Sequence, residues 1–111
     1  MPQVSRGIPA AETVPLATLV NYQEGSIVSR VLVGGQSATV TLFAFDGGQA
    51  LSEHTAPFDA LANVLEGEAE ITVSGKPLRT GPGEVVLMPA NQPHAVRALT
   101  RFKVLLTMVR S

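Results

Sequence analysis

Glycine and proline divide this chain into short apolar runs, and that spacing limits most strongly how it can fold. The runs are rich in Val, Leu, Ile and Ala, and they end at turns such as Gly34-Gly35, Asp46-Gly47-Gly48 and Gly81-Pro82-Gly83. No stretch longer than a turn or two has the 3.6-residue period of an amphipathic helix. About nine or ten short strands joined by tight turns are typical of a closed barrel or a two-sheet jelly roll. We therefore expect an all-β fold.

The strands can be assigned from these runs. Residues 1–17 contain three prolines and no clean period, so we expect an extended arm with one helical turn near Ala10–Thr13. The arm either lies over the domain or crosses to a second subunit. Residues 18–111 are expected to form one barrel domain, because the chain is too short for two cores. The expected strands are Leu19–Tyr22, Ile27–Val33, Ala38–Phe45, Leu51–Ala56, Leu61–Leu65, Ala69–Val73, Pro77–Arg79, Val85–Met88, His94–Ala98 and Arg101–Val109.

Composition argues against several classes of function. The net charge is −1 and Lys and Arg do not cluster, so we expect no nucleic-acid partner. No apolar run reaches the roughly 18–20 residues that cross a bilayer, so we expect no membrane association. The first residues lack the layout of a signal peptide, which predicts a cytoplasmic protein. There is no cysteine, and therefore neither a disulfide nor a thiolate metal site.

The protein has two histidines, His54 and His94, in two similar stretches. His54 lies between Gly48 and Gly67, and His94 follows a strand that ends at Pro89. Neutral imidazoles titrate near neutrality, so each could accept a proton or bind a ligand by a hydrogen bond. The alternative is that they are two barrel residues without a role. No G-x-S-x-G nucleophile motif and no glycine-rich phosphate loop accompanies them.

The two stretches resemble the paired motifs of the cupin family, small double-stranded β-helix (jelly-roll) barrels. The first family motif is G-x5-H-x-H-x3-E-x6-G, and Gly48, His54 and Gly67 fall in register with it. The second is G-x5-P-x-G-x2-H-x3-N, which Gly83, Pro89 and His94 match in the same way. The resemblance covers roughly Val40 to Val96 and implies a small single-domain cupin.

The departures from the motifs bear on function. The resemblance implies one divalent metal held by three histidines and a carboxylate, but Ala56 and Ala60 stand at the second histidine and the carboxylate positions. Catalytic zinc and facial-triad iron sites use three protein ligands, so two imidazoles predict at most a weakly bound divalent ion. Asp59 precedes the missing carboxylate, and on a regular strand it points to the opposite face.

Our leading hypothesis is a small-molecule ligand in a barrel pocket around His54 and His94, with no tightly bound cofactor. Phe58, Asn63 and Gln92 are the further residues expected to line that pocket, while Met88 and the other phenylalanines are expected to pack the core. The alternative is a metal-dependent enzyme of the oxygenase or isomerase type, in which water or Asp59 completes the set of ligands. A third possibility is a structural dimer whose pocket is filled by side chains.

A homodimer is expected for two reasons. The resemblance is to cupins that form dimers through edge strands. In addition, the strand Ala38–Phe45 carries Val40 and Leu42 on one face but Phe43 and Phe45 on the other, which predicts cover on both sides, by its own barrel and by a neighbour.

Overall fold

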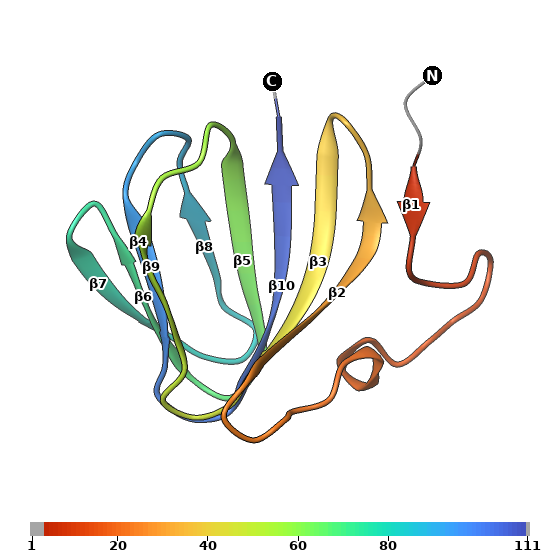
Figure 1. Cartoon of the computed structure of the whole chain (residues 1–111), viewed down its shortest axis with the longest axis horizontal. Coiled ribbons are helices and arrows are strands. Elements are labelled where there is room, and N and C mark those ends of the chain that lie inside the picture. Colours follow the sequence, from red (N-terminus) through yellow and green to blue (C-terminus); the bar gives the residue numbers. More distant parts are fainter. Residues whose placement is uncertain (1–3, 111) are drawn as a thin grey trace.

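A computed structural model describes residues 4–110, which form two facing antiparallel sheets (Figure 1). The six-stranded sheet has the order β1-β2-β3-β10-β5-β8, and the four-stranded sheet has the order β4-β9-β6-β7. The jelly-roll barrel is therefore confirmed. The elements are β1 (Ser5–Arg6), the 3-10 helix η1 (Leu16–Leu19), β2 (Ile27–Gly34), β3 (Ala38–Phe45), β4 (Ala50–His54), β5 (Asp59–Glu66), β6 (Ala69–Val73), β7 (Lys76–Thr80), β8 (Val85–Met88), β9 (His94–Ala98) and β10 (Phe102–Val109).

The predicted strands from Ile27 onward are present with small shifts at their ends, whereas the predicted strand Leu19–Tyr22 is wrong. The chain instead forms η1 and then continues without regular structure to β2. The expected helical turn near Ala10–Thr13 is only a turn at Ala10 and Ala11. Within residues 4–110, no helix is long and apolar enough to cross a membrane.

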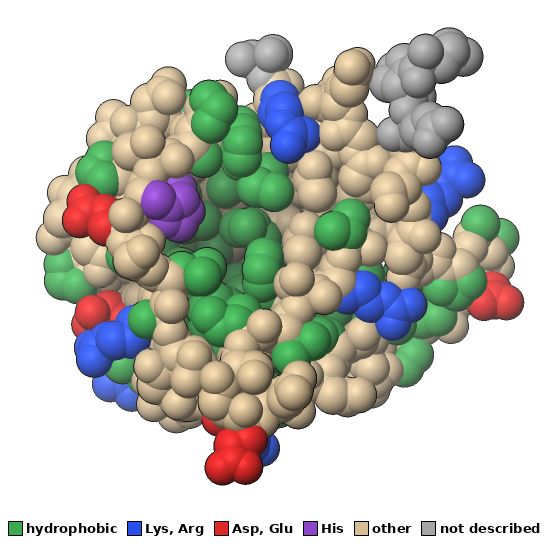
Figure 2. Space-filling model, in the orientation of Figure 1, with side chains coloured by type: hydrophobic (Ala, Val, Ile, Leu, Met, Phe, Trp, Pro, Cys, Tyr) green, Lys and Arg blue, Asp and Glu red, His purple; other side chains and the backbone are tan. Residues whose placement is uncertain are grey.

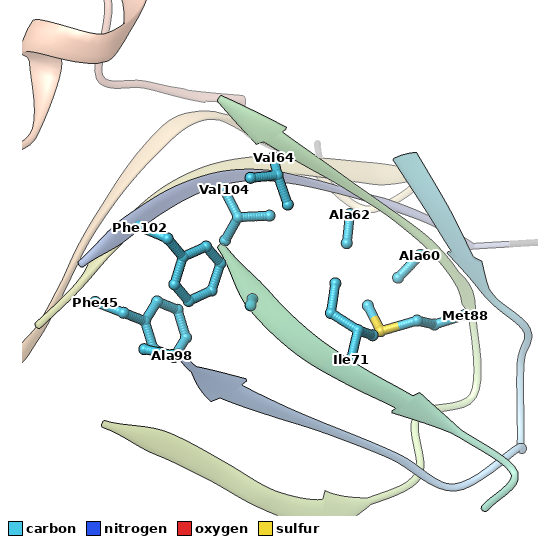
Figure 3. Close-up of a cluster of buried hydrophobic side chains, with 10 residues drawn as sticks. Phe45, Ala60, Ala62, Val64, Ile71, Met88, Ala98, Phe102 and Val104 are labelled. Carbon is cyan, nitrogen blue, oxygen red and sulfur yellow. The ribbon is translucent and has the colours of Figure 1, made fainter. Parts of the chain in front are cut away.

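The main core lies between the two sheets (Figure 3). Phe45 and Phe102 stack with their ring centroids 4.6 Å apart at one end of this core. At the other end Met88 lies beside Ile71 and Ala60. Alternation along β3 and β5 turns Phe45 and Ala60 inward, because successive residues of a strand point to opposite faces, and Phe102, Met88 and Ile71 enter the core from β10, β8 and β6.

A second core lies on the outer face of the six-stranded sheet. Leu42 and Ala44 of β3 are fully buried there, with Val20 and Leu32. Their cover includes Leu16, Leu19 and Tyr22 of the same chain. Burial on both faces of β3 was correctly expected. For this part of the strand, however, the covering residues come from the chain's own N-terminal segment (residues 16–22) rather than from a second subunit.

Lys103 links this N-terminal segment to the barrel through contacts with residues of both. It is 8% exposed, and its Nζ lies 3.1 Å from Glu66 Oε1 and donates to the Ala17 carbonyl at 2.5 Å. The ammonium also lies 5.0 Å from the ring centroid of Tyr22, whose hydroxyl donates to Glu66. The buried charge is thus fully partnered, as burial of a charge requires. The Tyr22 pKa is raised, first by burial and then by Glu66.

Candidate functional site

The two histidines lie next to each other at one end of the four-stranded sheet. His54 is the last residue of β4 and His94 is the first residue of β9, and the two are direct partners in the β4–β9 register. Their ring centroids are 4.3 Å apart, with the rings packed edge to face. Two residues 40 positions apart in sequence therefore meet because both lie at the same end of adjacent antiparallel strands.

Backbone carbonyls determine which imidazole nitrogens are free. His54 Nδ1 lies 2.8 Å from the Ser52 carbonyl oxygen, and His94 Nδ1 lies 3.2 Å from that of Gln92. A carbonyl can only accept, so each neutral ring is assigned as the tautomer with Nδ1–H donating and with the Nε2 lone pair free. The protein thus presents one free Nε2 acceptor on each of two neighbouring rings.

The environments of the two rings differ. His54 is exposed, whereas His94 is 7% exposed. Burial lowers the pKa of His94 below its ordinary value, the Gln92 carbonyl opposes this, and the nearby His54 lowers it further. His94 is therefore held as a neutral imidazole in a wider pH range than a histidine in water.

An apolar cavity of about 50 Å³ opens beside the pair. Figure 2 shows histidine side chains at the border of a hollow whose floor is hydrophobic. Apart from the two imidazoles, the lining is aliphatic, aromatic or thioether, and it comes from both sheets: Phe43, Phe45, Leu51, Ala62, Ile71, Met88, Val96, Val104 and Leu106.

The other expected pocket residues, Phe58, Asn63 and Gln92, do not line this cavity. Phe58 lies before β5 with the Arg110 guanidinium 5.1 Å from its ring centroid. Asn63 falls between the buried Ala62 and Val64, so the alternation of β5 turns it to the outer face.

Gln92 contributes to the site through its backbone rather than through its side chain. Its carbonyl holds the His94 ring, while its amide oxygen accepts a 2.6 Å hydrogen bond from Ser74 Oγ. Met88 and the phenylalanines other than Phe58 are expected from the sequence to pack the core, but Met88, Phe43 and Phe45 also line the cavity. Alternate residues of a strand share a face, and this alternation along β3 and β8 is the signal that could have placed Met88, Phe43 and Phe45 at the cavity.

The side chains of this site do not fit the divalent metal that the cupin resemblance implies. Ala60, at the carboxylate position, is 4% exposed and points into the core. Asp59 is on the outer face, where its Oδ1 accepts a 2.8 Å hydrogen bond from the Ala90 amide. Within residues 4–110, no three His, Cys, Asp or Glu side chains are grouped to hold a metal ion. Asp59 therefore does not serve as the third ligand.

Comparison with known proteins gives one family. The sequence profile described as "Cupin domain" matches residues 41–109. A conserved protein of unknown function from Streptococcus pyogenes is 36% identical, with a TM-score of 0.90 over 94% of this chain and 91% of its own. No curated protein matches the chain.

Two further solved structures are similar. A cupin superfamily protein from Desulfitobacterium hafniense is 30% identical, with a TM-score of 0.90 over 96% of this chain and 97% of its own. A cupin 2 conserved barrel domain protein from Leptotrichia buccalis is 45% identical, with a TM-score of 0.82 over 85% of this chain and 46% of its own.

Proposed function

This chain belongs to the cupin family, and from that premise we propose that it binds a small molecule at His54 and His94 without a tightly held divalent metal. The observation that carries the proposal is the pair of free Nε2 atoms beside an apolar cavity. Concave, mostly apolar sites with a few convergent polar groups are where proteins bind small ligands.

The cavity restricts the size and polarity of the ligand. Its volume of about 50 Å³ holds only a few water-sized groups, at about 10–15 Å³ for each. The wall offers no formal charge, and the two Nε2 atoms accept hydrogen bonds. The ligand that fits is a small apolar molecule with a hydroxyl or amine that donates to an imidazole.

Binding can be tested by thermal shift and histidine NMR with a panel of short alcohols, phenols and amines. A ligand of the proposed kind raises the melting temperature and moves the ring resonances of both histidines. The shift is lost in His54→Ala and in His94→Ala. It persists in Glu53→Ala, because Glu53 is the exposed neighbour of His54 on β4. Melting shifts that survive both histidine substitutions would refute the proposed site.

We also propose that the protein is a homodimer that packs through the outer face of the six-stranded sheet. On this face Leu87, Leu61, Thr107, Val40 and Val33 follow one another as cross-strand partners over five strands. Leu61 is 43% exposed and Leu87 is 53% exposed, and no charged residue interrupts the row.

The residues of the N-terminal segment cover only part of this face. They pack on Leu42, Ala44 and Leu105, whereas Leu61, Leu87 and Val85 stay open. A sheet with one face on the core normally has a polar outer face. An uncharged row that is apolar apart from Thr107 is the feature expected of a surface that a second copy covers.

A further inference from the structure

Two methionines flank the position at which the cupin motif has its carboxylate. In the β5–β8 register Ala60 pairs with Met88, and in the β5–β10 register it pairs with Met108. Cross-strand partners share a face of the sheet, so both side chains lie on the inner face with Ala60. Met88 is 3% exposed and lines the same cavity as His54 and His94, whereas Met108 is only half-buried and is not part of the lining.

We propose that His54 Nε2, His94 Nε2 and the Met88 thioether form a binding site for a soft monovalent metal ion, namely Cu(I). Ligand softness supports this choice. Thioether sulfur selects Cu(I), and imidazole nitrogen binds copper well, whereas the hard divalent ions prefer carboxylate and water oxygens. The chain has lost the carboxylate of the motif and has a thioether directly beside that position (Figure 3).

The absence of a charged donor among the described residues of the site also favours a singly charged ion. All three donors are neutral, and the rest of the cavity wall is apolar. The cost of transferring an ion from water to such surroundings rises steeply with its charge, and no carboxylate is there to offset a second positive charge. A singly charged ion that bonds strongly to nitrogen and sulfur is therefore better suited to this cavity than Zn²⁺, Mn²⁺ or Fe²⁺.

The hydrogen bonds of the two histidines prepare the site for an ion. Metal-ligating imidazoles usually donate their other N–H to a carbonyl or carboxylate, which fixes the ring orientation and the tautomer. Ser52 and Gln92 provide these carbonyls here. The inference uses the same two imidazoles as the proposed ligand site, but it depends in addition on Met88, and this difference separates the two in experiment.

The test is an anaerobic titration of the full-length protein with Cu(I), in competition with the chromophoric chelator bicinchoninate. We expect one Cu(I) per chain, with affinity reduced about tenfold or more by Met88→Leu and by either histidine-to-alanine change. Met88→Leu conserves volume and should cost less than about 1.5 kcal/mol in stability, so a loss of affinity is not a loss of fold. Met108→Leu is the matched control and should keep the affinity of the unmodified protein.

Methyl NMR with Ag(I), a redox-inert analogue of Cu(I), provides a second readout. The Met88 methyl resonance should move with one equivalent of Ag(I) while that of Met108 stays in place. Equal Cu(I) affinity in the Met88→Leu and unmodified proteins would overturn the site, as would binding that survives both histidine changes. Fragment binding that is unchanged in Met88→Leu would leave the proposed small-molecule function standing even if Cu(I) binding fails.

Discussion

His54 and His94 are direct cross-strand partners, with their ring centroids 4.3 Å apart, yet only His94 is buried. The two rings thus have different roles in the energetics of the fold. His54 is exposed to solvent, whereas a proton on His94 must be held in an apolar cavity beside another imidazole. The pair presents two acceptors when it is neutral, and protonation of His94 opposes folding.

The first prediction concerns pH. Burial depresses the His94 pKa below its ordinary value of 6.5, so the unfolded chain binds the proton first as the pH falls. The free energy of unfolding should therefore be highest above about pH 6.5, decrease below it, and stop decreasing from this cause once the folded pKa is passed. Urea unfolding of the protein and of His94→Asn between about pH 8 and pH 5 measures the effect. Parallel profiles for the two proteins would contradict the prediction.

The second prediction restores the missing carboxylate. Ala60→Glu places an acid on the inner face opposite the two imidazoles, where a divalent ion needs a third ligand. Without metal the variant should lose about 1–3 kcal/mol, because a buried carboxyl lacks partners. Ni²⁺ or Mn²⁺ should then stabilise it, by about 2.7 kcal/mol at a hundredfold excess over the dissociation constant.

The matched control for this variant is Thr72→Glu, which puts the same side chain on the outer face of the four-stranded sheet, next to the buried Ile71 and outside the proposed dimer contact. It should show no metal-dependent rise in melting temperature. If Ala60→Glu shows no such rise either, then the imidazole pair is not oriented toward position 60.

The third prediction compares two glycines. Gly67 has a φ of +74°, and a Cβ placed there would lie 1.9 Å from the Arg101 carbonyl oxygen. Gly75 has a similar φ of +80° but nothing within 4 Å of such a Cβ. Gly67→Ala should therefore cost at least about 3 kcal/mol, since it adds a backbone clash to the strain. Gly75→Ala should cost about 1–2 kcal/mol from strain alone. Equal losses in urea unfolding would show that the β10 backbone yields to the new methyl group.

Most strands could be predicted from the sequence because the residues that end a strand are its immediate neighbours in the chain. β3 and β8 begin and end at the residues expected, and their ends are explained by local signals, since Asp46-Gly47-Gly48 and Pro89 end these strands whatever surrounds them. Leu19–Tyr22 had no such signals. Its apolar residues serve a tertiary purpose, to cover Leu42 and Ala44, and that demand is met by a 3-10 turn as well as by a strand.

The site was only partly predictable for a related reason. The motif offsets identified His54 and His94, and the strand register then brings them together. Phe58 was expected because it lies between the two lost ligand positions, and Asn63 and Gln92 because they are polar residues expected near the barrel mouth. Asn63 instead points to the outer face of β5 by the alternation of the strand, and Phe58 and Gln92 lie in loops. Met88 and Phe43 reach the cavity from other strands, and which strands face each other depends on how the barrel closes.

The last prediction concerns assembly. A dimer through the outer face of the six-stranded sheet buries Leu61 and Leu87 against a second copy, so Leu61→Glu with Leu87→Glu places charges in an apolar contact. Light scattering after size exclusion should give a dimer for the unmodified protein and a monomer for the double variant, with unchanged circular dichroism because both side chains are exposed in the single chain. Leu99→Glu, at an exposed leucine before β10, should remain dimeric. A dimer that survives the double substitution would assign the interface to another surface, and a monomeric unmodified protein would refute the homodimer itself.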